Sequence, residues 1–181
     1  MEPGTTFWQG KTVCVTGGTG FLGFHLVGLL RELGSRVRVL ALPPAESHPL
    51  LQWDDVECCF GDVRDRDTVR RALAGCALVF HTAGVVAVWG KALRRMHEVH
   101  VLGTRRVLEE APPGARVVHT SSIVTVGASC NGEVLDEDSP FCLGGLRVGY
   151  VHAKREAERL ALEAVRQGRD VVVTNPGYLL G

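Results

Sequence analysis

Residues 11–23 read KTVCVTGGTGFLG, and this stretch decides the fold. Residues 12–16 form a short apolar run rich in β-branched side chains, which predicts a strand buried on both faces. Three glycines then stand at three-residue spacing: Gly17, Gly20 and Gly23. Leucines recur at helical spacing over residues 22–33, and Gly34 stands where a helix C-cap is expected. The stretch therefore predicts a strand, a glycine turn and a helix, which together make the first half of a βαβ unit.

A glycine turn in this position is suited to binding a diphosphate. Without a Cβ atom, the backbone can turn sharply and approach the anion closely. The free N–H groups and the positive dipole of the following helix then face the anion. An ordinary strand-to-helix turn with chance glycines is the alternative, and the placement between a strand and a helix favours dinucleotide binding.

Composition limits the possible partners. The chain has 181 residues, so one domain is expected. Its 20 basic and 20 acidic side chains balance, so no long-range electrostatic field is expected. No run approaches the ~20 apolar residues of a membrane span, and the start lacks an apolar signal segment. We expect no nucleic-acid partner, no membrane span and a cytoplasmic protein. The six cysteines show no CxxC spacing, which favours reduced thiols and no metal site.

Strands and helices alternate along the rest of the chain. Further strands are predicted at residues 36–42, 56–60, 77–81, 115–120 and 171–174, and helices at residues 65–74, 92–111 and 149–167. The long irregular connection at residues 126–148 is of a kind that is usually functional. This order predicts an α/β fold, a Rossmann-type doubly wound parallel sheet with helices on both faces. Ligands of such sheets bind beyond the carboxyl ends of the strands.

The helix predicted at residues 149–167 carries the candidate chemistry. Lys154 falls on its apolar stripe, where a cation is costly without a partner or a role. Tyr150 lies one turn earlier on the same face, and a nearby ammonium would lower the pKa of its phenol. Tyr150 is thus a candidate general acid/base for hydroxyl–carbonyl interconversion, with Ser122 hydrogen-bonding the substrate oxygen. The alternative is that Lys154 extends to solvent and Tyr150 is ordinary core.

Several motifs along the chain resemble those of one enzyme superfamily. They are TGGTGFLG at 16–23, GDV at 61–63, HTAG at 81–84, TSS at 120–122, YVHAK at 150–154 and NPG at 175–177. With these motifs the chain resembles the extended, epimerase-like branch of the short-chain dehydrogenase/reductase superfamily. Within this branch its sequence is most similar to dihydroflavonol-reductase-like and 3β-hydroxysteroid-dehydrogenase-like members, and less similar to sugar-nucleotide epimerases.

The resemblance implies NAD(P) as cofactor and a small-molecule substrate. It implies a catalytic role for Ser122, Tyr150 and Lys154. It implies cofactor contacts from Gly17, Thr19, Gly20, Phe21, Leu22, Gly23, Asp62, Val63, His81, Ala83, Gly84, Thr120, Tyr150, Lys154 and Pro176. Where relatives usually carry a proton-relaying asparagine this chain has His100, which could relay protons or simply pack.

The cofactor selector also departs from the family pattern. Ala41 and Leu42 occupy the places of an acid for the ribose 2′-OH and of an arginine for a 2′-phosphate. Because no acid repels a 2′-phosphate there, and Arg36 and Arg38 add positive charge, we expect a lean towards NADP, with Arg38 as a further candidate cofactor contact.

We therefore expect an NAD(P)-dependent oxidoreductase acting on a sterol-, flavonoid- or sugar-nucleotide-like substrate. Residues 1–181 would form the NAD(P)-binding Rossmann domain. The resemblance implies a further strand and a C-terminal substrate lobe, and the sequence stops at Gly181 without them. We expect this chain alone to turn over little substrate and to self-associate, for example as a homodimer, through the apolar strand at 171–174. An epimerase, a nucleotide-sensing regulator and an inactive truncated isoform are the alternatives.

Overall fold

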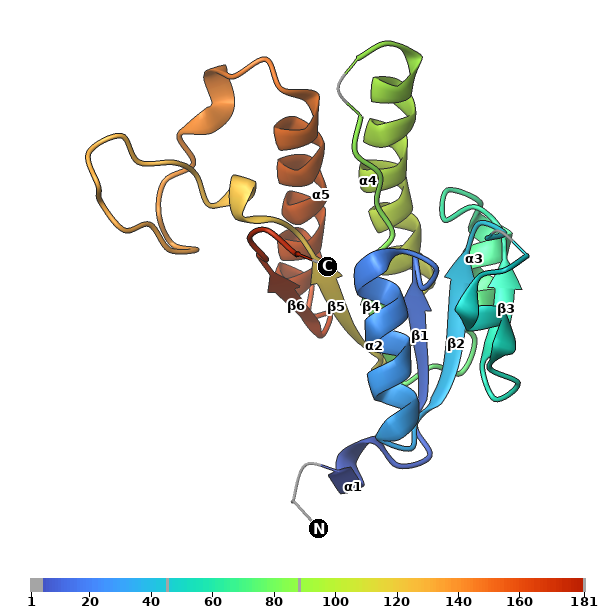
Figure 1. Cartoon of the computed structure of the whole chain (residues 1–181). Helices are drawn as coiled ribbons and strands as arrows, with labels where there is room; N and C mark the ends of the chain where they lie inside the picture. The colour runs from blue at the N-terminus through green and yellow to red at the C-terminus, as the bar shows by residue number, and fades with distance from the viewer. Residues whose placement is uncertain (1–4, 45, 88, 181) are drawn as a thin grey trace.

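A six-stranded, wholly parallel sheet forms the centre of the molecule, in a computed structural model that describes residues 5–44, 46–87 and 89–180 (Figure 1). Its strands are β1 (Thr12–Thr16), β2 (Arg36–Ala41), β3 (Glu57–Phe60), β4 (Leu78–His81), β5 (Arg116–Thr120) and β6 (Val171–Thr174). They are ordered β3-β2-β1-β4-β5-β6. This order reverses direction between β1 and β4, where doubly wound sheets bind their ligands. The prediction of a Rossmann-type parallel sheet is confirmed.

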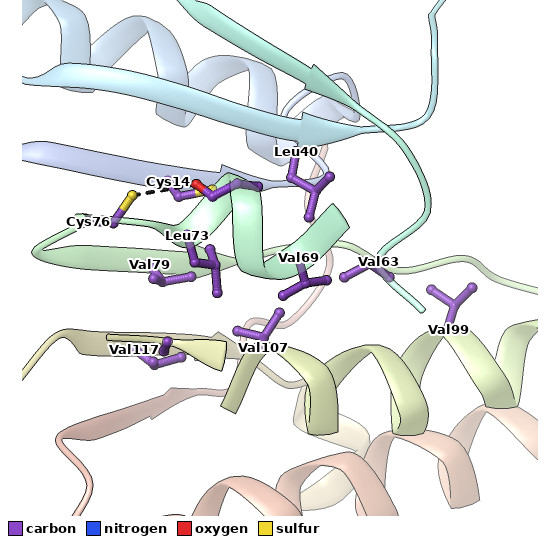
Figure 2. Packing of buried hydrophobic residues seen from close by; sticks show 12 residues of the cluster. Cys14, Leu40, Val63, Val69, Leu73, Cys76, Val79, Val99, Val107 and Val117 are labelled. Carbon is purple, nitrogen blue, oxygen red and sulfur yellow. Dashed lines mark hydrogen bonds between the residues drawn. The ribbon is translucent and has the colours of Figure 1, made fainter. Parts of the chain in front are cut away.

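Helices cover both faces of the sheet. They are α1 (Thr5–Trp8), α2 (Phe21–Glu32), α3 (Arg66–Leu73), α4 (Lys91–Glu110) and α5 (Gly149–Arg166), with 3-10 turns η1 (Pro49–Gln52), η2 (Ile123–Thr125) and η3 (Leu143–Gly145). Buried residues of α2 and η1 pack with β1 and β2 in one hydrophobic cluster. Residues of α3 and α4 pack on the opposite face in a second cluster (Figure 2).

The second cluster contains two of the six cysteines. Cys14 on β1 and Cys76 before β4 are buried free thiols, and Cys76 Sγ lies 3.7 Å from the Ala72 carbonyl oxygen (Figure 2). They fill space as small hydrophobic side chains, as the sequence predicted. Cys130 and Cys142 are instead exposed, in the long irregular connection.

The leucine stripe predicted for the first long helix is partly wrong. The buried residues of α2 are Gly23, Val27 and Leu30, whereas Leu29 is 53% exposed. Leu29 follows a run of apolar residues, so that composition alone does not show which side of the helix meets the sheet. The glycine turn fixes this orientation, because it places Gly23 against the backbone of the turn.

The predicted element boundaries hold to within one or two residues. The strands at 12–16 and 171–174 match the structure at both ends. α4 has the predicted length but is shifted by one residue, and the other observed elements are shorter than predicted by a residue or two. Within the described residues β6 pairs with β5 alone, and Val172 on it is 42% exposed. None of the helices in this part of the chain is both long enough and apolar enough for a membrane crossing.

Candidate active site

In the glycine turn after β1, Gly17 and Gly23 leave no room for a Cβ atom beside neighbouring backbone. Gly17 has φ +74°, and a Cβ atom there would lie 2.8 Å from the Ala83 Cα atom. A Cβ atom on Gly23 would run into the Gly17 carbonyl oxygen. Both glycines therefore let the turn pack tightly between the first turn of α2 and the segment after β4.

Gly20 is different, because the space beside it is open. It is the N-cap residue of α2, it supplies no side-chain cap, and a Cβ atom would meet only the Gly17 carbonyl oxygen at 3.3 Å. The first N–H groups of an α-helix have no partners within the helix, so these donors are left for a ligand. The open turn at a 12-residue helix therefore fits a diphosphate.

A cavity of about 220 Å³ extends from this turn over the ends of β1 to β3. Among the predicted cofactor contacts it is lined by Gly17, Thr19, Gly20, Asp62, Val63, Ala83 and Gly84. Ala41 and Leu42 also line it, so the positions of the missing selector do face this space. An adenosine-sized group placed here would meet a largely apolar wall.

Asp62 at this cavity has an arginine partner. The Arg64 guanidinium donates to both of its carboxylate oxygens, at 2.7 to 3.1 Å, and the Arg64 backbone N–H donates to Oδ1. These hydrogen bonds hold the pKa of the Asp62 carboxyl below its usual value. Arg64 also pairs with Glu98 on α4, so the acid is fixed in place as an anion.

Arg38, a predicted cofactor contact, does not line this cavity. Its guanidinium donates to the Ala72 and Ala74 carbonyl oxygens, both at 2.9 Å, and its Nε lies 2.8 Å from a Glu57 carboxylate oxygen. The side chain of a middle β2 residue points to the C-terminal end of α3, whose carbonyls attract a cation. The basic residue that does line the cavity is Arg95 on α4, which the sequence analysis missed.

His81 lines neither this cavity nor the second cavity described below. Its Nδ1 lies 2.7 Å from Thr16 Oγ1 and its Nε2 lies 3.0 Å from Thr104 Oγ1, which ties β4 to β1 and α4. Burial and neighbouring positive charge hold its pKa well below the usual value. The His81 side chain therefore ties β4 to its neighbours, and its predicted cofactor contact stays a prediction.

A second cavity, of about 360 Å³, brings the remaining predicted residues together. It is lined by Gly17, Gly20, Phe21, Leu22, Gly23, Gly84, His100, Thr120, Ser122, Tyr150, Lys154 and Pro176. The glycine turn and the candidate catalytic side chains thus share one continuous space at the carboxyl ends of β1, β4 and β5.

Lys154 points inward from α5. Its side chain is buried, with 7% of the residue exposed, and Nζ donates to the Thr120 carbonyl oxygen at 3.0 Å. Nζ lies 5.9 Å from the centroid of the Tyr150 ring. Burial lowers the pKa of this ammonium to about 8. The alternative that Lys154 extends to solvent is excluded.

His100 packs against Tyr150. The two rings meet edge to face, with centroids 5.7 Å apart. His100 Nε2 lies 2.8 Å from the Val85 carbonyl oxygen, which can only accept, so Nε2 carries a proton and donates. Burial lowers the pKa of His100 to about 4, so its imidazole is neutral at pH 7. The neutral ring forms a fixed wall beside the phenol.

Ser122 is the N-cap residue of η2 at the end of β5, and it is 9% exposed. In the part of the chain that the structure describes, its Oγ accepts one hydrogen bond, a long one of 3.4 Å from the Val124 backbone N–H. Behind Ser122 lies the buried carboxylate of Glu158 on α5, a residue that was not predicted from the sequence. The signal was available, because Glu158 lies one helical turn after Lys154 on the same face.

Comparisons with known proteins bear on the family and the fold of the chain. The model of a family described as the NAD dependent epimerase/dehydratase family matches residues 13–181. The chain is 38% identical over 179 residues to a putative dihydroflavonol 4-reductase of Synechocystis, covering 96% of this chain and 51% of that protein. It is 39% identical over 168 residues to human 3 beta-hydroxysteroid dehydrogenase type 7, covering 87% and 45%.

Solved structures with a similar fold include a member of the short-chain dehydrogenase/reductase superfamily. A short-chain dehydrogenase/reductase superfamily protein of Agrobacterium tumefaciens with bound NAD is 28% identical, with a TM-score of 0.73, and covers 91% of this chain and 48% of that one. The chain spans about half the length of the curated relatives it matches.

Proposed function

This chain belongs to the NAD dependent epimerase/dehydratase family, as its motifs predicted, and we propose that it serves the NAD(P)-dependent interconversion of a secondary alcohol and a ketone. One observation carries the proposal: a single cavity is lined by the glycine turn and by Ser122, Tyr150 and Lys154. A nicotinamide cofactor bound there would supply or accept the hydride. The side chains of the chain would position both reactants and move the proton.

Tyr150 is the proposed general acid/base. Its hydroxyl would exchange the proton with the substrate oxygen, and Ser122 Oγ would orient that oxygen by a hydrogen bond. The long contact that Ser122 Oγ makes with Val124 supports this role, because it leaves the hydroxyl free to find a better partner. Lys154 would keep positive charge near the phenol and bind the nicotinamide ribose.

The cofactor would lie across both cavities. The open N-terminus of α2 at Gly20 would bind the diphosphate, and the wall formed by Asp62 and Val63 would contact the adenosine. Pro176, which lines the second cavity, would border the nicotinamide. This assignment follows the lining residues, and it leaves the substrate on the side of Ser122 and Tyr150.

The proposed lean towards NADP now depends on Arg95. Within the described residues Arg95 has no hydrogen-bond or ion-pair partner, and it faces the same cavity as Ala41 and Leu42. A 2′-phosphate placed beside Ala41 would meet no acidic selector and could pair with this guanidinium.

The substrate itself we propose to be a sterol-, flavonoid- or sugar-nucleotide-like alcohol or ketone. Residues 1–181 would act as the dinucleotide-binding domain, and enclosure by a separate substrate lobe would be needed for efficient turnover. Enclosure and orientation can be worth ~7–11 kcal/mol in well-aligned cases, so a substrate lobe would matter far more for turnover than for cofactor binding.

Binding and turnover test the proposal together. We expect NADH and NADPH to bind the chain, with enhanced nicotinamide fluorescence. In a form that turns over a secondary alcohol, Tyr150→Phe should cut the rate by ~10²–10⁴-fold while cofactor affinity stays within about twofold. Tyr178→Phe is the control, since Tyr178 is 97% exposed. Parental turnover by Tyr150→Phe would refute the proton donor, and failure of both nucleotides to bind would refute the function.

A further inference from the structure

We propose that Glu158 is a positioning residue that fixes the nicotinamide side of the cavity, acting through a buried carboxylate. The inference rests on the proposed function, because it concerns the same site. Glu158 is 6% exposed and lines neither cavity, so it would touch no ligand directly. Its effect would pass through the residues that it holds.

Four donors converge on this carboxylate. Glu158 Oε2 accepts hydrogen bonds from the hydroxyls of Ser121, at 2.6 Å, and Thr125. It also accepts one from Asn175 Nδ2 at 2.8 Å. Oε1 accepts one from the Arg155 guanidinium at 2.8 Å. A side chain with so many partners has one available position, and its partners are fixed with it.

The donors come from separate parts of the chain. Ser121 follows β5, Thr125 ends η2 and Asn175 follows β6. Two backbone hydrogen bonds join the same segments: Ser121 N–H donates to the Thr174 carbonyl at 2.8 Å, and Ile123 N–H donates to the Pro176 carbonyl at 3.0 Å. Because both lie beside Ser122, Glu158 holds the segment that carries the proposed substrate-orienting hydroxyl.

The network also reaches the proposed nicotinamide border. Asn175 Nδ2 lies 2.8 Å from Thr125 Oγ1 and 3.3 Å from the Ser122 carbonyl oxygen. Asn175 directly precedes Pro176, which lines the second cavity. Ser122 and Pro176 are therefore held to one another by a shared anion behind the cavity wall.

The negative charge of Glu158 is essential to this arrangement. An ionised carboxylate only accepts, so both oxygens can serve all four donors. A glutamine in its place would keep one oxygen and add two N–H donors, and one of these would face a donor. Such a mismatch leaves buried polar groups unsatisfied, which displaces the segments that they hold.

The adenosine side of the cavity lies outside the network. The glycine turn and Asp62 make no hydrogen bond to any of its members among the described residues. Loss of Glu158 should therefore weaken contacts to the nicotinamide ring while contacts to the rest of the dinucleotide persist. NADH and ADP-ribose differ by the nicotinamide, so their affinities separate the two effects.

The experiment compares Glu158→Gln with Glu156→Gln by calorimetric titration with NADH and with ADP-ribose. Glu156 lies on the same helix with its side chain 48% exposed, and it pairs with His97, so it controls for a loss of charge on α5. Removing the buried anion should raise the Kd for NADH by about tenfold, the scale of one charge-assisted hydrogen bond. The Kd for ADP-ribose should stay within about twofold, and the Glu156 variant should match the parent for both ligands.

A purely structural Glu158 would give a different result. The inference is overturned if Glu158→Gln, shown to be folded, weakens both ligands equally or neither. If that variant does not fold, Thr125→Val decides, because it keeps the shape of the side chain and removes the hydroxyl that contacts Glu158, Asn175 and the Ser122 carbonyl oxygen. A change of about threefold confined to NADH is expected, and an unchanged ratio overturns the inference. Failure of both ligands to bind the unsubstituted chain would instead refute the proposed function.

Discussion

Lys154 makes the stability of the fold depend on pH in a direction that can be calculated. Burial lowers the pKa of its ammonium from 10.5 to about 8. The unfolded chain has the ordinary value, so between these two pH values the unfolded state binds more protons than the folded state. The free energy of unfolding therefore rises as pH rises through this window.

The size of the effect follows from the two pKa values. At ~1.4 kcal/mol for each pH unit, the gap between them corresponds to roughly 3 kcal/mol. Between about pH 7.5 and about pH 9.5 we expect a gain of about 2 kcal/mol from this group alone. The Thr120 carbonyl oxygen, which is the hydrogen-bond acceptor of Nζ among the described residues, and the negative charge of Glu158 do not offset the lost hydration, so the charged form is the costly one.

Urea unfolding of the parent and of Lys154→Met across this range measures the gain. Other groups titrate there too, so the difference between the two proteins is the quantity to compare. Lys154→Met should lack the rise, whereas Lys91→Met should keep it, because Lys91 is exposed. Parallel curves for the parent and Lys154→Met would show that the ammonium is hydrated, and the reasoning from burial would fail.

Three further predictions test other parts of the site. Burial lowers the pKa of His119 to about 3, so stability should fall as pH drops below 6.5; urea unfolding of His119→Leu should show a weaker dependence, and an identical one would contradict this. Gly20→Ala should weaken NADH binding with little change in Tm, whereas Gly23→Ala should lower Tm by several degrees; the reverse order would refute the steric reading. Arg95→Gln should raise the Kd for NADPH about tenfold and change the Kd for NADH by no more than about twofold, with Arg94→Gln as control. Equal losses of affinity for both nucleotides would show that Arg95 does not contact the 2′-phosphate.

The sequence predicted the parallel sheet, because local signals agreed along the chain. The strands at 12–16 and 171–174 are short apolar runs bounded by glycine or polar residues, and tertiary packing did not need to override them. The glycine turn was equally visible, since its spacing reflects the steric needs of Gly17 and Gly23. Tyr150, Lys154 and Ser122 meet at one cavity because α5 packs where β5 ends.

Side-chain directions were harder to predict. Arg38 was placed near the cofactor because it belongs to β2, whose end forms the adenosine wall. Which carbonyls its long side chain reaches depends on where α3 ends, and no local pattern gives that. Arg95 was not predicted, because no local pattern shows that this exposed arginine on α4 lines the cavity.

Glu158 shows how an amphipathic pattern can mislead. Charged residues on a helix are usually solvated, so a glutamate among Arg155, Glu156 and Arg159 reads as surface. Yet Tyr150, Lys154 and Glu158 stand at successive four-residue intervals, which puts all three on one face. Two buried charges on that face need partners, and Thr120 and Ser121 supply them in matching order along the end of β5. If α5 were shifted by one residue along β5, Lys154 and Glu158 would both lose these partners. Although burying these two charges is costly, their pairing therefore fixes the position of α5 in which Tyr150 faces the cavity.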